Sequence, residues 1–290
     1  MAFYQLQRRL RALKQLQFEY FDHERQLIDE LDALETKYHR TWDKLFSKRG
    51  SIVAGDYEPD DDECDWVNDE EDICNKLMKS LKIDEECDLT GIPEFWLTVL
   101  KNAKIIDGMV HSYDEPVLKY LYDVRIEYFK SPDPPGFMFE FYFNKNDYFK
   151  NSVLTKRYYT RNEVDKNHLA DYQGKEICKS VGCDILWRLG KNVTVRRIQV
   201  KRGGEKKVRL YSFFNFFKPP VIPDDTDYAD LDEKTKKILR LDFKDANIFK
   251  DHIIPRAVLY FTGEAKDVDS DDDIQSDESD TDDINPASTV

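Results

Sequence analysis

The first part of the chain contains no glycine or proline between Ala2 and Arg49, and its apolar residues recur at alternating spacings of four and three. An apolar period of 3.5 residues sustained over several heptads predicts a long helix in a coiled-coil-like pairing. Gly50 is predicted to end this helix, which would be about 70 Å long at 1.5 Å per residue. The apolar stripe consists of Leu6, Leu10, Leu13, Tyr20, Leu27, Leu31, Leu34, Tyr38 and Leu45.

A helix of this length cannot cover its own apolar stripe, so the stripe requires a partner surface. Two interpretations remain open: packing on the rest of the same chain, and pairing with a second copy. The second is favoured because the sequence contains no other heptad segment of similar length. We therefore expect residues 1–50 to form a homodimer.

The chain is acidic, with 58 Asp and Glu residues against 44 Lys and Arg residues and a net charge of -14. The acidity is local, because Asp56 to Asp72 holds 11 acids, Asp267 to Asp283 holds 10, and neither segment contains Lys or Arg. Blocks of like charge stay solvated and often serve as interaction tails. The charge distribution therefore predicts a basic partner and speaks against direct, sequence-specific nucleic-acid binding.

The rest of the chain shows helical patterns first, then strands, then helices again. Short helices are predicted over 73–89, from Pro93 onward, and over 115–121. The last folded part, 231–261, is also predicted to be helical. Alternating apolar residues predict strands over the ranges 123–128, 137–143, 154–160 and 184–188, and a hairpin over 193–211.

This order predicts an α+β fold with an antiparallel sheet. We expect a long helix over 1–50, an acidic accessory segment over 51–90, an α+β domain over 91–265 and a disordered acidic tail over 266–290.

Sequence features of enzymes are missing. There is no phosphate-binding glycine loop, no nucleophile elbow and no zinc-protease motif, and the five histidines and five cysteines lie at no metal-ligand spacing. We therefore expect no catalytic residues, no metal and no cofactor. The N-terminus lacks a signal-peptide apolar run, and no stretch approaches membrane-spanning length, which favours a reduced cytosolic or nuclear location.

The predicted hairpin is basic. Lys201, Arg202, Lys206 and Lys207 are candidates for nuclear import, although a soluble exposed strand pair and contact with an acidic neighbouring dimer are alternative interpretations. In the tail, Ser270 and Ser279 precede acidic residues, a context that suits phosphorylation by an acidophilic kinase.

Several segments, in this order, resemble the nucleosome assembly protein family of histone chaperones. They are RALKQLQ (11–17), LETKY (34–38), LFSKR (45–49), YEP (57–59), IPEFWLTVLKN (92–102), LTK (154–156), SFFNFF (212–217) with Pro219 and Pro220, and IPRAVLYFTG (254–263). The aromatic segments around 95–96 and 213–217 are expected to pack in the core.

The resemblance implies an obligate dimer, an "earmuff" domain, ATP-independent binding of core histones, nucleosome assembly and disassembly, and shuttling between cytoplasm and nucleus with an import receptor. Higher assembly of dimers is an open expectation. The rival hypothesis is an acidic scaffold or inhibitor that acts on a non-histone protein. The candidate histone-binding carboxylates are Asp60, Asp61, Asp62, Glu63, Asp114, Glu115, Asp123, Glu127, Asp271, Asp272, Asp273, Asp277 and Glu278.

Overall fold

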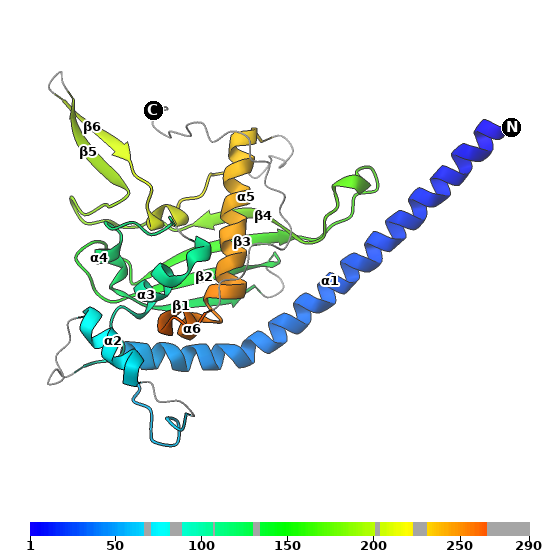
Figure 1. Ribbon diagram of the computed structural model, residues 1–290. Helices are drawn as coiled ribbons and strands as arrows, with labels where there is room; N and C mark the ends of the chain where they lie inside the picture. The colour runs from blue at the N-terminus through cyan, green and yellow to red at the C-terminus, as the bar shows by residue number, and fades with distance from the viewer. Residues whose placement is uncertain are drawn as a thin grey trace.

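The computed structural model describes residues 1–66, 71–81, 89–106, 108–129, 134–200, 204–222 and 231–265. A single long helix, α1 (Ala2–Ala54), passes along one side of a compact α+β body and projects beyond it (Figure 1). Its 53 residues correspond to about 80 Å. The predicted α+β class with a long N-terminal helix is confirmed.

The predicted end of this helix was wrong by four residues. α1 ends at Ala54, and Gly55 caps it in the left-handed conformation with φ of 78°, a backbone region that favours glycine. Gly50 lies inside the helix and is buried. A Cβ atom at position 50 would lie 2.5 Å from Asp123 Oδ2. Gly50 therefore permits close approach of the helix to the first strand and does not end the helix.

Three short helices and a 3-10 turn precede the sheet. They are α2 (Glu71–Leu81), α3 (Phe95–Asn102), η1 (Lys104–Ile106) and α4 (Glu115–Leu118). Each α-helix was predicted at its place, but α4 is shorter than expected because Leu121 already starts a strand. The part of the first predicted helix at 82–88 lies outside the described residues.

Four antiparallel strands form the main sheet in the order β1-β2-β3-β4. Their bounds are β1 Leu121–Tyr128, β2 Gly136–Phe143, β3 Val153–Arg161 and β4 Glu176–Gly182, and a 3-10 turn, η2 (Leu169–Asp171), lies between the last two. The first three strands confirm the alternation seen in the sequence.

The predicted strand at 184–188 was wrong, and β4 was missed. The 184–188 segment makes only an isolated bridge between Phe149 and Trp187. Its apolar residues Ile185 and Trp187 pack against the core, where the Trp187 ring lies 5.5 Å from Phe149 and 5.3 Å from Phe214. β4 carries a mixture of charged, polar and apolar residues and gives no clear period of two, so only its pairing with β3 defines it.

The chain then forms the predicted hairpin, β5 (Val195–Val200) and β6 (Gly204–Arg209), whose turn lies outside the described residues. The aromatic 3-10 turn η3 (Phe213–Phe217) follows. Helix α5 (Glu233–Ile248) crosses one face of the main sheet (Figure 1), and the π-helical turn η5 (Phe249–Ile253) joins it to α6 (Ala257–Thr262).

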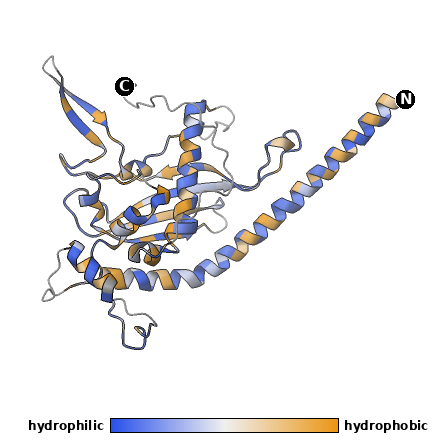
Figure 2. Ribbon diagram, in the orientation of Figure 1, coloured by the Kyte–Doolittle hydropathy of each residue, from blue (hydrophilic) through white to orange (hydrophobic). Residues whose placement is uncertain are grey.

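An aromatic core lies between the sheet and these helices. Phe139 and Phe141 of β2 are fully buried, and Phe141 meets Phe217 of η3 edge-on at 5.1 Å, a favoured aromatic geometry. The expectation that the two aromatic-rich segments pack in the core is confirmed, because Phe95, Trp96 and all four phenylalanines of η3 are buried. Hydrophobic residues gather in the body and recur in bands along α1 (Figure 2).

A buried polar cluster fixes α5 on the sheet. Lys156 of β3 is fully buried and its ammonium pairs with Asp242 of α5. Ser180 Oγ also donates to Asp242, at 3.0 Å, and the Lys156 Nζ atom lies 3.9 Å from the centre of the Phe216 ring. The burial of Asp245, followed by the charge of the neighbouring Asp242 carboxylate, raises the pKa of Asp245 to about 6. No helix in the described ranges has the length and apolarity needed to span a membrane.

Candidate binding surfaces

The apolar stripe of α1 is uncovered in the single chain. All nine residues predicted to form it are between 48% and 64% exposed, although leucine and tyrosine side chains usually bury most of their surface in a globular protein. An uncovered apolar face of this length marks an interaction surface. It does not pack on the rest of its own chain, which was the alternative interpretation of the stripe.

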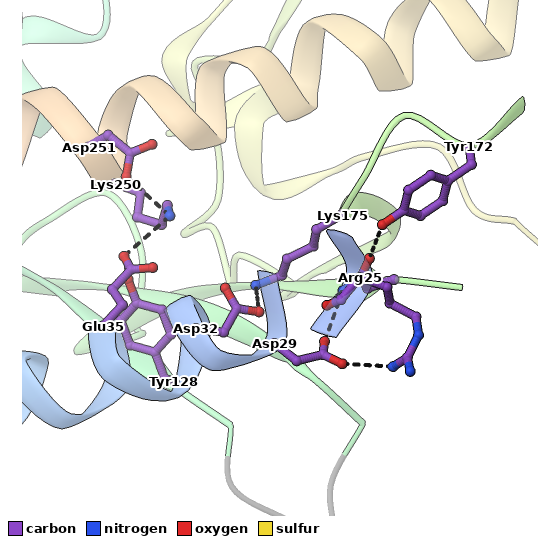
Figure 3. A network of polar contacts seen from close by, with 10 residues as sticks. Arg25, Asp29, Asp32, Glu35, Tyr128, Tyr172, Lys175, Lys250 and Asp251 are labelled. Atoms are coloured by element: carbon purple, nitrogen blue, oxygen red, sulfur yellow. Dashed lines mark hydrogen bonds and ion pairs between the residues drawn. The ribbon is translucent and has the colours of Figure 1, made fainter. Parts of the chain in front are cut away.

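A different face of α1 is held against the body by a polar network (Figure 3). The Tyr128 hydroxyl of β1 donates to Glu35 Oε1 at 2.8 Å, and Lys250 Nζ lies 3.4 Å from the same oxygen. Burial, followed by the neighbouring Glu35 carboxylate, raises the pKa of Tyr128, so its hydroxyl remains a donor. Lys175 Nζ pairs with Asp32 Oδ2 at 2.5 Å.

The loop between β3 and β4 extends this network along α1. Asn162 Nδ2 donates to Asp29 Oδ1 at 2.9 Å and to the Arg25 carbonyl at 3.1 Å, and the Tyr172 hydroxyl donates to Asn162 Oδ1 at 3.1 Å. The Tyr172 ring also packs 5.1 Å from Phe21. α1 is therefore anchored to the body on one face and open to a partner on another.

A groove of about 1330 Å³ lies between α1, the β3–β4 loop and α5. Its charges are mixed, and several are paired with each other: Lys175 with Asp32, and Arg161 with Glu176 at 2.7 Å. Because its cations and anions largely compensate, the groove is not a strongly acidic surface.

Residues 56–66 of the first acidic segment form an exposed turn next to the end of α1. The Glu63 amide donates to Asp60 Oδ1 at 3.0 Å, and Glu63 Oε2 accepts from the Tyr57 hydroxyl at 2.6 Å. Lys48 of α1 pairs with Glu63, and the hydrogen bonds from Lys48 and Tyr57 lower the pKa of Glu63. Glu63 therefore anchors the turn.

The remaining carboxylates of the turn are available to a partner. Asp60, Asp61 and Asp62 are exposed, and among the described residues no Lys or Arg forms an ion pair with them. Three adjacent anions on an anchored turn are a compact surface for Lys and Arg side chains. We call Asp60, Asp61 and Asp62 the acidic turn.

The prediction that Asp114 and Asp123 bind a partner is corrected by the structure. Asp114 and Asp123 have no exposed surface. Asp114 accepts from the Phe213 amide at 3.0 Å and from Ser212 Oγ at 2.6 Å, which joins the start of α4 to η3. Asp123 pairs with Arg125 at 2.5 Å beside Gly50. Both side chains hold the fold together, because a buried carboxylate requires such partners.

The other two predicted carboxylates of the body lie on the surface. Glu127 of β1 is exposed and lines a second groove, of about 330 Å³, beside α1. Glu115 is partly exposed and pairs with Lys101 at 3.0 Å. No residue of the acidic turn lines the groove beside Glu127, and Glu115 lines neither of the two grooves described above.

Several predicted site residues lie outside the described residues. They are Lys201, Arg202, Ser270, Asp271, Asp272, Asp273, Asp277, Glu278 and Ser279. Of the import candidates, Lys206 and Lys207 are described and both are exposed on β6. Across the ranges that the structure covers, no three His, Cys, Asp or Glu side chains are grouped so that they could hold a metal ion.

Comparison with known proteins identifies the family. The family model described as "Nucleosome assembly protein (NAP)" matches residues 8–264, which is nearly the whole described chain. The chain belongs to the nucleosome assembly protein family. This confirms the resemblance drawn from the ordered sequence segments and the expectation of a non-enzymatic protein.

Named relatives and a solved structure agree with this assignment. The chain is 41% identical to Nucleosome assembly protein 1-like 1-A of Xenopus laevis over 282 residues, covering 92% of this chain and 71% of that protein. It is 42% identical to human Nucleosome assembly protein 1-like 1, covering 92% and 72%. The structure of Nucleosome Assembly Protein 1 from Plasmodium knowlesi is 28% identical, with a TM-score of 0.58, covering 90% of this chain and 98% of that one.

The sequence interpretation missed the polar network that anchors α1. Asp29, Asp32 and Glu35 lie between the stripe positions at helical spacing, a pattern that could have indicated a second contact face. Their partners Tyr128, Asn162 and Lys250 are distant in sequence and carry no motif, so only the fold reveals them.

Proposed function

We propose that this chain is an ATP-independent histone chaperone that binds core histones and shields their basic surface. The observation that carries the proposal is the acidic turn, an anchored and exposed group of carboxylates on a member of the nucleosome assembly protein family. By reducing non-specific contacts between histones and DNA, such a protein promotes nucleosome assembly and, in reverse, disassembly.

The proposed mechanism is competition between carboxylates and DNA phosphates for the same Lys and Arg side chains. The acidic turn is fully described, and the tail of 10 acids between Asp267 and Asp283 would add a second anionic segment. Glu115 and Glu127 remain candidates on the body, whereas Asp114 and Asp123 are excluded by their burial. Because exposed charges are screened, affinity should fall steeply as salt rises.

We further propose that the working unit is a homodimer paired through the exposed stripe of α1. A dimer would present two acidic turns and two tails to one histone complex, and linked sites raise overall affinity without new contacts. The nine exposed apolar residues support this, since leaving them in water is unfavourable.

We also propose that the protein moves between cytoplasm and nucleus. An import receptor would bind the basic residues Lys201, Arg202, Lys206 and Lys207, of which Lys206 and Lys207 are exposed on β6. Replacing all four residues with alanine and following a fluorescent fusion in cells tests this step. Unchanged nuclear entry would contradict it.

The binding proposal is tested by titrating a labelled histone H2A–H2B dimer with the full chain at several salt concentrations. The variant Asp60→Asn/Asp61→Asn/Asp62→Asn should bind roughly tenfold more weakly, because three exposed ion pairs at about 0.5 kcal/mol each sum to about 1.5 kcal/mol, and about 1.4 kcal/mol corresponds to a factor of ten. The matched control, Asp147→Asn/Glu163→Gln/Asp184→Asn, removes the same charge from scattered exposed sites and should bind nearly as the parent does. Equal losses in both variants, or affinity independent of salt, would contradict the proposal.

A further inference from the structure

Helix α5 has a basic outer face. Between Lys234 and Asn247, every exposed charged side chain is a cation, whereas Asp242 and Asp245 turn toward the sheet and are partly buried. We call this surface the basic face, and it consists of Lys234, Lys237, Ile238, Arg240, Leu241 and Lys244.

The cations lie together on one side of the helix. Lys237, Arg240, Leu241 and Lys244 have the i, i+3, i+4, i+7 spacing of a single helical face. Among the described residues, no carboxylate lies within ion-pair distance of Lys237 or Lys244, and Arg240 reaches only Glu233, at 4.0 Å. Within the part of the chain that the structure describes, the positive charge of Lys237 and Lys244 is therefore not paired, although Arg240 and Lys244 also line the mixed-charge groove beside the β3–β4 loop.

Two apolar side chains lie among these cations. Ile238 is 42% exposed and Leu241 is 55% exposed. A ligand that matches this face needs carboxylates with occasional apolar residues between them. A histone does not meet this requirement, because its basic surface would be repelled by the same cations.

The chain itself contains such a ligand. Its segment 267–283 holds 10 carboxylates and no Lys or Arg, and it also carries Val268 and Ile274. We propose that this acidic C-terminal segment docks on the basic face of α5 in its own chain. Docking would place carboxylates against the cations and apolar residues against Ile238 and Leu241.

The geometry permits this contact. The described chain ends at Ala265, three residues after α6, and η5 joins α6 directly to α5. The 25 residues that follow can reach about 80 Å when extended, whereas α5 is only about 24 Å long. The basic β5–β6 hairpin, the competing cationic surface, lies at the end of the body away from α6 (Figure 1).

Docking would regulate the proposed chaperone, and this consequence rests on the proposed function. A docked tail is withheld from histones, so a histone must displace it before the tail can contribute to binding. If the tail were docked nine-tenths of the time, the apparent dissociation constant for its ligand would rise about tenfold. Phosphates added to Ser270 or Ser279 would strengthen docking, because each adds about -1.5 to -2 of charge.

The docking itself is tested on the full chain without histones, by zero-length carbodiimide cross-linking and peptide mass spectrometry. We expect Lys234, Lys237 and Lys244 to be joined to carboxylates of 267–283 several-fold more often than Lys206 and Lys207 of the hairpin. In the variant Lys237→Glu/Arg240→Glu/Lys244→Glu, the links of the retained Lys234 should fall several-fold. The control Arg196→Glu/Arg197→Glu/Arg209→Glu, with the same charge change in the hairpin, should leave them unchanged.

Three outcomes would overturn the proposal. Links spread evenly over α5 and the hairpin would show that the acidic tail contacts basic residues without preference. Links mainly to the hairpin would show that the tail docks there and not on α5. When isotopically light and heavy copies are mixed, links that join the two would assign the tail to a second copy. The α5 variant should also bind a histone dimer about tenfold more tightly, and only with the tail present. If the protein did not bind histones but the cross-links between α5 and the tail were still found, only the proposed function would be refuted, and the docking proposal would stand.

Discussion

Shortening three leucines in the middle of the α1 stripe should dissociate the dimer. Leu27, Leu31 and Leu34 are 56%, 53% and 48% exposed in the single chain. Burying a whole leucine side chain is worth about 1.5–3 kcal/mol, so covering the remaining half is worth about 1 kcal/mol. Replacing all three with alanine in both protomers therefore costs about 6 kcal/mol, or roughly 10,000-fold in the dissociation constant.

Analytical ultracentrifugation of the full chain from nanomolar to micromolar concentration measures this effect. Alanine has the highest helix propensity, so α1 should remain helical, which circular dichroism checks. Leu241→Ala is the matched control, because Leu241 is 55% exposed on another helix and should leave the dimer intact. An unchanged dissociation constant in the triple variant would refute the assignment of the stripe to the dimer interface.

Three further predictions concern how the body is held together. Lys156→Met leaves Asp242 without its buried partner and should lower the free energy of unfolding by about 3–5 kcal/mol, whereas the double variant Lys156→Met/Asp242→Leu should regain most of this loss. Urea denaturation at pH 7 measures the free energy of unfolding of both variants, and equal losses would contradict the buried pair. The pKa of Asp245 is raised to about 6, so its stabilising contribution is complete below about pH 4 and is lost as pH rises through 6. Denaturation between pH 4 and 7.5 should show this loss of stability, on the order of 1 kcal/mol after screening, and the variant Asp245→Asn should lack it. If Asp245→Asn kept the pH dependence of the parent, the raised pKa of Asp245 would not be its cause. Gly50→Ala places a Cβ atom 2.5 Å from Asp123 Oδ2 and should destabilise the protein by about 1–3 kcal/mol, although alanine favours a helix; a stabilised variant in thermal denaturation would disprove the close contact.

The elements that could be predicted from the sequence are those with a strong local pattern. The heptads of α1 and the alternating phenylalanines of β2 specify both the element and its apolar face. The basic hairpin was found for the same reason. By contrast, β4 is defined by its pairing with β3 across a long loop, and the apolar residues Ile185 and Trp187 pack against the core without forming a strand.

The binding carboxylates illustrate the same limit. Composition located the acidic turn, because runs of Asp and Glu cannot be buried together. Composition could not distinguish Asp114 and Asp123 from Glu115 and Glu127. Asp123 and Glu127 lie on the same side of β1, and Asp123 is buried because α1 approaches it closely at Gly50. Gly50 is a similar case: the sequence records a glycine, but only the position of Asp123 explains it.

The anchoring of α1 through Glu35 and Asn162 has a geometric consequence for any pair of these chains. Because each helix is fixed to its own body, the register of the paired helices determines how far apart the two bodies stand. Sliding the register by one heptad would displace one helix along the other by about 10 Å. In such a pair, the length of α1 and the register of its stripe would therefore determine the distance between the two acidic turns.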